Sequence, residues 1–127
     1  YLSGAPYIED DSGRAGGLPR DASFAVMGDL NADPEDPSAF RGAIRALIGH
    51  ERVNGAVVPT ASPARRGQDT DLDPEDTSRW AARIDYVLPS ATLSVQEARV
   101  WRPASNAVPD VPVSDHFPVW IDVRIGP

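Results

Sequence analysis

The spacing of apolar residues predicts a strand and then a helix in the first half of the chain. At residues 24–27 the sequence FAVM forms a short apolar run that stops at Gly28, a pattern typical of a strand buried on both faces. Apolar residues then recur at helical intervals over residues 40–48, and Gly49 ends the pattern. We therefore expect a buried strand that carries Asp29 at its C-terminal end, followed by one amphipathic helix.

The second half of the chain alternates between apolar and polar positions, which predicts β-strands. Residues 84–88 and 119–125 show the clearest alternation, and residues 93–102 show it imperfectly. Because neighbouring side chains of a strand point to opposite faces, Asp85 lies on the face opposite to the apolar residues around it. We predict three further strands, of which the last closes the sheet.

Segments without a hydrophobic period separate these elements. The first 23 residues are rich in Gly, Pro and Asp and predict an irregular lead-in. Polar stretches at 59–79 and 103–112 are too long for tight turns and predict loops. The whole chain, residues 1–127, is therefore expected to be α+β, with one mixed, largely antiparallel sheet and a flanking helix.

Charge and composition limit the classes of function. The chain has 12 basic and 19 acidic residues and a net charge of −7, which argues against a non-specific grip on nucleic acid or on an anionic membrane. A bound divalent cation would outweigh this balance locally, so phosphate substrates remain open. The chain has no Cys and no apolar run long enough to span a membrane, so we expect no membrane insertion. Secreted and cytoplasmic locations both remain open.

Three short blocks place polar groups at the end or on one face of an apolar strand. They are Gly28-Asp29-Leu30-Asn31, Arg83-Ile84-Asp85-Tyr86 and Ser114-Asp115-His116. Each block alone is typical of a turn or of a solvated strand face. Together they supply carboxylates, an imidazole and an amide, which are the groups that metal-assisted hydrolysis of a phosphate ester requires.

In order and spacing, the triple GDLN, RIDYVL and SDHFPV resembles the C-terminal half of the endonuclease/exonuclease/phosphatase superfamily, the DNase I-like proteins. The resemblance spans Phe24 to Ile125. It implies half of a four-layer α/β/β/α sandwich, in which each half of the domain contributes one sheet. It also implies hydrolysis of phosphate mono- or diesters by activated water, with Mg²⁺, or Mn²⁺ in its place, as the cofactor.

The resemblance implies a role for each polar residue of the three blocks. Asp29 would orient or deprotonate the attacking water, and Asn31 would donate to a phosphoryl oxygen. His116 would act as general acid/base or stabilise developing charge, with Asp85 accepting from its other ring nitrogen and raising its pKa. Asp115 would sit beside the metal. Asp29 and His116 both remain candidates for the base, although the imidazole is better matched to neutral pH.

The resemblance omits the first half of that family's domain, including a metal-binding Glu in a Gln-Glu pair. Gln96 and Glu97 imitate the pair but lie between the second and third blocks, so we interpret them as strand-surface residues. Without that Glu the site would bind Mg²⁺ weakly, and we expect the chain alone to be nearly inactive. The open face of the sheet would be covered by the N-terminal half or by a second copy.

Substrate class is less determined. In the resembled family the loop before the RIDY strand borders the substrate, which makes Thr77, Arg79 and Trp80 candidates for substrate contacts. A small or lipid phosphoester is favoured over nucleic acid because the chain is acidic, and a nuclease stays open as one alternative. A non-catalytic interaction module on the same scaffold is the other, although the intact polar set counts against it.

Overall fold

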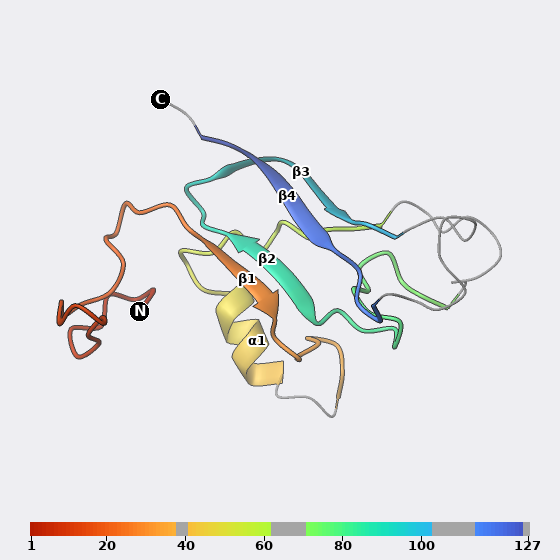
Figure 1. Ribbon diagram of the computed structural model, residues 1–127, viewed down its shortest axis with the longest axis horizontal. Helices are drawn as coiled ribbons and strands as arrows, with labels where there is room; N and C mark the ends of the chain where they lie inside the picture. The colour runs from red at the N-terminus through yellow and green to blue at the C-terminus, as the bar shows by residue number, and fades with distance from the viewer. Residues whose placement is uncertain (38–40, 62–70, 103–113, 126–127) are drawn as a thin grey trace.

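The computed structural model describes residues 1–37, 41–61, 71–102 and 114–125. One helix and four strands follow one another along these residues (Figure 1): β1 (Ala25–Asp29), α1 (Arg41–Ile48), β2 (Asp85–Pro89), β3 (Ser94–Val100) and β4 (Val119–Arg124). Each of these elements lies within two residues of a segment in which the hydrophobic pattern predicts the same type of element. The residues just before α1 lie outside the described part of the chain.

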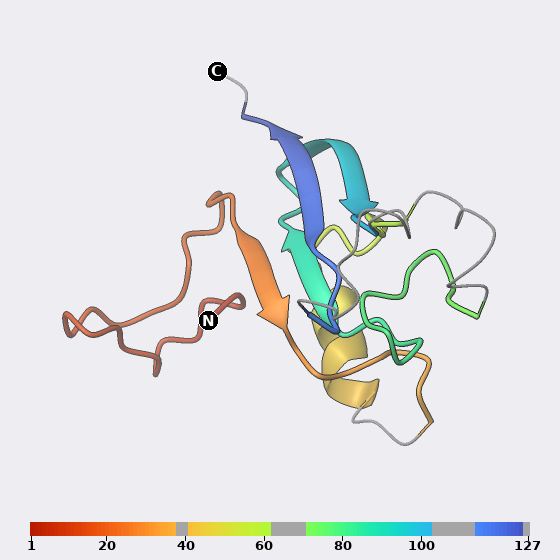
Figure 2. The same ribbon diagram turned by 45° about the vertical axis from the view of Figure 1, so that its right-hand side comes forward.

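The described strands form two two-stranded antiparallel sheets, β1 with β2 and β3 with β4. In the first sheet the register places Met27 opposite Val87 and Asp29 opposite Asp85. Figures 1 and 2 both show β2 beside β4, with the two strands running in the same direction. The order in space is therefore β1, β2, β4, β3.

The α+β class with a flanking helix is confirmed, whereas the prediction of one continuous mixed sheet needs correction. Within the described residues, no strand ladder joins β2 to β4. The amides of Ile84 and Asp85, at the start of β2, donate to Thr77 Oγ1 at 3.0 and 2.9 Å. Because a loop side chain takes these donors, the start of β2 is bonded to the loop instead of to β4.

Helix α1 covers one face of the first sheet. Its Ile44 is buried in a cluster with Val53 and with Tyr86 and Leu88 of β2. Tyr86 and Leu88 are two residues apart, so they point to the same face of the strand. This matches the predicted helical period, although Phe40, the first apolar position in it, lies outside the described residues.

A second, smaller cluster buries one face of β3 and β4. Its buried members come from a loop, from β3 and from the segment before β4: Ala61, Val100 and Phe117. Gln96 and Glu97 are exposed on β3, where the register shifts between Val95 and Glu97. The expectation that they are strand-surface residues is therefore confirmed.

Residues 1–24 contain turns and an isolated bridge between Glu9 and Ala15, and one arginine attaches them to the rest of the chain. The guanidinium of Arg52 lies over the Phe24 ring, 5.4 Å from its centroid. The same group donates to four backbone carbonyls of this segment, those of Leu2, Leu18, Pro19 and Ala22. Within the described residues, no helix is long and apolar enough to cross a membrane.

Candidate active site

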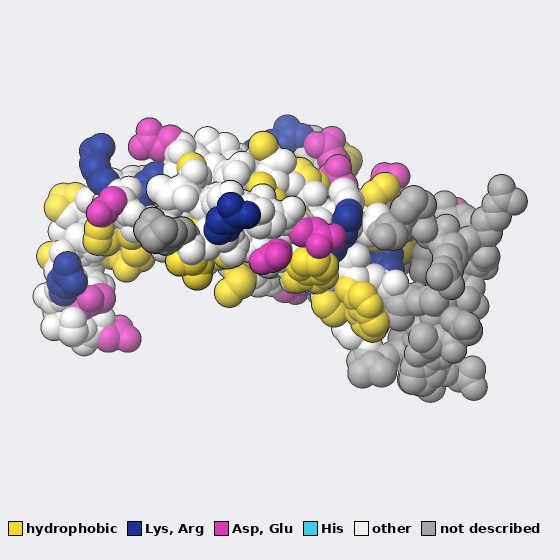
Figure 3. Space-filling model, turned by 90° about the horizontal axis from the view of Figure 1, so that it is seen from above, with side chains coloured by type: hydrophobic (Ala, Val, Ile, Leu, Met, Phe, Trp, Pro, Cys, Tyr) yellow, Lys and Arg dark blue, Asp and Glu magenta, His cyan; other side chains and the backbone are white. Residues whose placement is uncertain are grey.

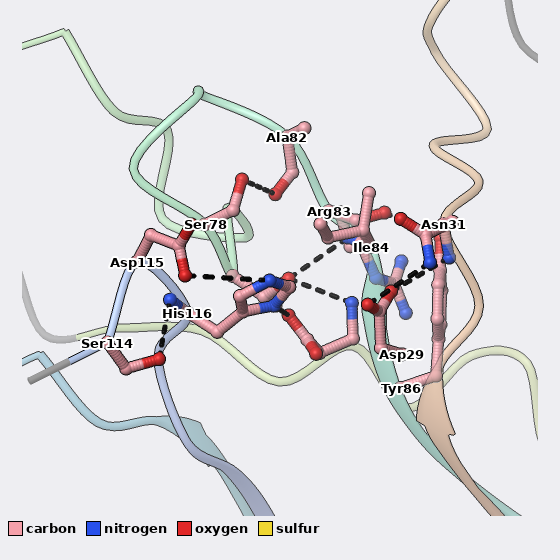
Figure 4. Close-up of polar contacts among 12 residues, drawn as sticks. Asp29, Asn31, Ser78, Ala82, Arg83, Ile84, Tyr86, Ser114, Asp115 and His116 are labelled. Atoms are coloured by element: carbon pink, nitrogen blue, oxygen red, sulfur yellow. Dashed lines mark hydrogen bonds and ion pairs between the residues drawn. The ribbon is translucent and has the colours of Figure 1, made fainter.

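Three of the predicted site residues converge at one end of the first sheet. Asp29 ends β1 and Asp85 begins β2, and the register pairs them, so both carboxylates lie on one face. That face is opposite to helix α1, because the helix packs against the alternate residues of β2. His116 approaches from the segment before β4 and points toward Asp29 (Figure 4). The ligand atoms of Asp29, Asp85 and His116 all lie within 4.8 Å of one another.

The imidazole of His116 is hydrogen-bonded to Asp85. Its Nδ1 lies 2.9 Å from Asp85 Oδ2, with the two side chains 29% and 18% exposed. The bond to Asp85 raises the pKa of His116, the negative charges of Asp85, Asp115 and Asp29 add to this rise, and burial opposes it. Because Nδ1 faces Asp85, Nε2 is the ring nitrogen left for other partners.

The GDLN turn holds Asp29 through its own backbone and side chains. Asn31 donates to Asp29 from its main-chain amide at 2.9 Å and from its side-chain amide at 3.2 Å. Asn31 adopts a positive φ of 48°, which Asn tolerates better than most residues, and Gly28 has a φ of 147° that favours glycine. The Asn31 amide nitrogen keeps a second proton that can serve a ligand.

A buried tyrosine anchors this turn to β2, a role that the sequence pattern did not reveal. The Tyr86 hydroxyl lies 2.7 Å from the Ala32 carbonyl oxygen and 2.8 Å from the Arg83 carbonyl oxygen, so its single proton is shared between these two acceptors. Burial raises the pKa of Tyr86 to about 12, so it stays a donor at neutral pH. Asp33 adds a second link, because its carboxylate accepts the Arg83 amide at 2.8 Å. The only signal was an aromatic residue in the RIDY block.

The remaining predicted residues surround His116. The Asp115 carboxylate is 3.9 Å from His116 Nε2 and stands outside the converging group of three. Trp80 is 61% exposed and meets the His116 ring edge-on, with centroids 5.6 Å apart. Arg79 is exposed and donates its backbone amide to the Asp115 carbonyl at 2.9 Å. Thr77 is only 1% exposed, so the expectation that it contacts substrate is wrong.

The carboxylate oxygens of the site suit a divalent cation, whereas its imidazole is held as a proton-transfer group. Asp29 and Asp85 offer carboxylate oxygens, the ligands that Mg²⁺ prefers, and the neighbouring Asp115 offers another. His116 commits its Nδ1 to Asp85, which is the arrangement of a proton-transfer group held by a carboxylate. The chain thus presents both a site for positive charge and an imidazole beside it.

One comparison with known proteins identifies the family. The family model described as "Endonuclease/Exonuclease/phosphatase family" matches residues 1–116, a span that ends on His116 and contains all three polar blocks. Neither the curated proteins nor the solved structures include a match to the chain. This family is one of hydrolases that generally use divalent metals, in agreement with the acidic group at the end of the first sheet. Its model covers most of the chain, which therefore belongs to the endonuclease/exonuclease/phosphatase family.

Proposed function

We propose that the chain carries the proton-transfer and phosphate-orienting residues of a Mg²⁺-dependent phosphoesterase, which hydrolyses phosphate mono- or diesters by attack of activated water. The observation that supports it best is the convergence of Asp29, Asp85 and His116 within 4.8 Å, with the imidazole held by Asp85. Membership of a hydrolytic family agrees with this chemistry.

In the proposed mechanism, the raised pKa of His116 separates the roles of the two candidate bases. Asp85 holds the ring at Nδ1 and favours its protonated form, so that Nε2 donates to the leaving oxygen or to a phosphoryl oxygen as charge develops. Asp29 would then orient the water and accept its proton. Asn31 holds the Asp29 carboxylate and directs its second amide proton to a phosphoryl oxygen.

When bound, Mg²⁺ would supply positive charge that stabilises the phosphoryl oxygens. Asp115 is the proposed protein ligand, and its carboxylate lies 3.9 Å from His116 Nε2, next to the group formed by Asp29, Asp85 and His116. Manganese would fit the same oxygen ligands. We further propose that the chain contributes the C-terminal half of the catalytic domain and that a carboxylate from the other half completes the metal site.

The outer face of the first sheet supports this division of the domain. Met27 lies on the same face as Asp29 and is 70% exposed, whereas its cross-strand partner Val87 is only 8% exposed, so the open apolar surface on this face is centred on Met27. More generally, the view from above in Figure 3 shows hydrophobic side chains with acidic and basic ones between them. We propose that the N-terminal half of the domain, or failing that a second copy, covers this face.

For the substrate, we propose a small or lipid phosphoester that contacts Trp80 and Arg79. Trp80 exposes its indole beside the reacting imidazole. The Arg79 guanidinium lies over the ring of Phe117, the residue after His116, 5.6 Å from the ring centroid, and so brings positive charge near the acidic site. The net charge of −7 gives no support for the broad basic surface that binds a nucleic acid backbone.

The experiment uses a chromogenic phosphodiester and a chromogenic phosphomonoester. It compares the chain alone with the full-length protein, which means the chain together with the proposed N-terminal half. The full-length protein should release product with Mg²⁺ or Mn²⁺ and stop when the metal is chelated, and the isolated chain should be nearly inactive. Turnover by the isolated chain at the full-length rate would refute the division of the site, and a full-length protein inactive on both substrates with either metal would refute the proposed hydrolysis.

A further inference from the structure

The pairing of His116 with Asp85 joins two sheets that share no strand ladder in the described residues. Asp85 belongs to the first sheet, whereas His116 precedes β4 of the second. A hydrogen bond of 2.9 Å between partly exposed side chains does not by itself set the position of two sheets. Another part of the molecule must therefore hold the two backbones in register.

Thr77 contacts both backbones and is buried between them. Its Oγ1 accepts the amides of Ile84 at 3.0 Å and Asp85 at 2.9 Å. Its carbonyl accepts the amide of Phe117, next to His116, at 2.7 Å. The Thr77 side chain is 1% exposed, so no solvent replaces these bonds. One residue thus fixes the backbone on each side of the pair.

Hydrogen bonds within the loop that follows Thr77 hold the backbone of this loop in place. The Ala82 carbonyl accepts the amides of Thr77 at 3.0 Å and Ser78 at 3.2 Å, and also the Ser78 hydroxyl at 3.2 Å (Figure 4). Ser78 forms an antiparallel bridge with His116. The segment 77–79 therefore runs beside the histidine and cannot shift without breaking several hydrogen bonds.

We propose that Thr77 is a positioning residue, which holds Asp85 and His116 at hydrogen-bonding distance and so fixes the proton arrangement of the imidazole. This inference rests on the proposed function, because it explains how that function's proton-transfer pair is assembled. With Asp85 accepting from Nδ1, neutral His116 carries its proton on Nδ1, which leaves Nε2 to take up the proton that it donates in the proposed mechanism. Loss of the Thr77 acceptor would leave the amides of Ile84 and Asp85 without this partner, loosen Asp85 relative to His116 and mix the two tautomers.

The test replaces the hydroxyl while keeping the shape of the side chain. Thr77→Val removes the acceptor, Thr77→Ser restores it, and Thr77→Ala leaves room for a water if the valine variant does not fold. Ser78→Ala is the matched control, since it removes one buried hydroxyl bond from the same loop without touching the Asp85 amide. The readout is the ¹⁵N spectrum of neutral His116, which reports the tautomer and does not depend on turnover.

Wild type, Thr77→Ser and Ser78→Ala should show the Nδ1-protonated tautomer, and Thr77→Val or Thr77→Ala should show a mixture. In the full-length enzyme, Thr77→Val should lower kcat about 100-fold with little change in KM, because the reacting group is misplaced. An unchanged tautomer in both Thr77→Val and Thr77→Ala, or an equal loss in Ser78→Ala, overturns the inference. A wild-type protein with no hydrolysis but with the expected tautomers would sink only the proposed function.

Discussion

Asp29 and Asp85 face each other across the antiparallel pair of β1 and β2, with one carboxylate ending the first strand and the other beginning the second. This register gathers negative charge at one end of a sheet whose helix-covered face is apolar. His116 lies against that charge, and its protonated form balances part of it. The acid–base behaviour of the site follows from this arrangement.

Replacing Asp85 with Asn should lower the pKa of His116. The hydrogen bond to the Asp85 carboxylate is the largest cause of the raised value, and an amide cannot supply the negative charge. Proton NMR titration of the His116 ring measures the effect in the isolated chain, with His50 as an internal reference. A pKa for His116 that stays unchanged or rises in Asp85→Asn would show that the pairing is absent in solution.

The same pair makes the stability of the chain depend on pH in a defined direction. Because the pKa of His116 is raised in the folded state from an ordinary 6.5, its stabilising contribution is fully present below the unfolded value and is lost as pH rises through the folded value. Urea unfolding of wild type and His116→Gln should differ more at about pH 5.5 than at about pH 8.5. A difference that widens toward alkaline pH contradicts the pairing.

Replacing Gly28 in the GDLN turn should destabilise the protein. Its φ of 147° strains any residue with a side chain, although the space around a Cβ there is open. Gly28→Ala should lower the free energy of unfolding by about 1–3 kcal/mol. Gly42→Ala is the matched control in helix α1, where the space is also open and alanine should stabilise by about 0.5–1 kcal/mol. If denaturant unfolding gave the same change in free energy of unfolding for Gly28→Ala and Gly42→Ala, the strained backbone assigned to Gly28 would be contradicted.

Removing the Tyr86 hydroxyl should loosen the same turn from β2. Tyr86→Phe leaves the carbonyls of Ala32 and Arg83 without this donor, and we expect a loss of about 1–3 kcal/mol in unfolding free energy. Tyr7 is 86% exposed, so Tyr7→Phe should change stability by no more than about 0.5 kcal/mol. If Tyr86→Phe were as stable as Tyr7→Phe, the Tyr86 hydroxyl would not hold the turn to β2.

Hydrophobic periodicity predicts where the elements of this chain lie, although the expectation that β1 is buried on both faces is wrong, because most of its residues are exposed. Ile44, Tyr86 and Leu88 occur at the intervals that place them in one cluster, and they do meet there. The family resemblance then directs attention to Asp29, Asp85 and His116, which the structure brings together. These residues can be recognised because each lies at or near the end of a predicted strand and because the three motifs occur in the order that the family has.

Contacts between a side chain and a distant backbone group leave no period in the sequence. Thr77 looks like a polar loop residue, and only the structure shows that it is buried against the amides of Ile84 and Asp85. The division into two sheets likewise leaves no mark in the hydrophobic pattern. Tyr86 reads as an ordinary core aromatic until its hydroxyl partners are seen.

The most direct measurement is phosphate-ester hydrolysis by the full-length protein carrying His116→Ala, beside His50→Ala as a control. The chain has two histidines, and His50 bonds Ser3 and Arg52 outside the site. We predict that His116→Ala lowers kcat by about 10²–10⁴-fold while its melting temperature, measured at about pH 8.5, stays near the wild-type value, and that His50→Ala retains activity. Full activity in folded His116→Ala would contradict the proposed mechanism.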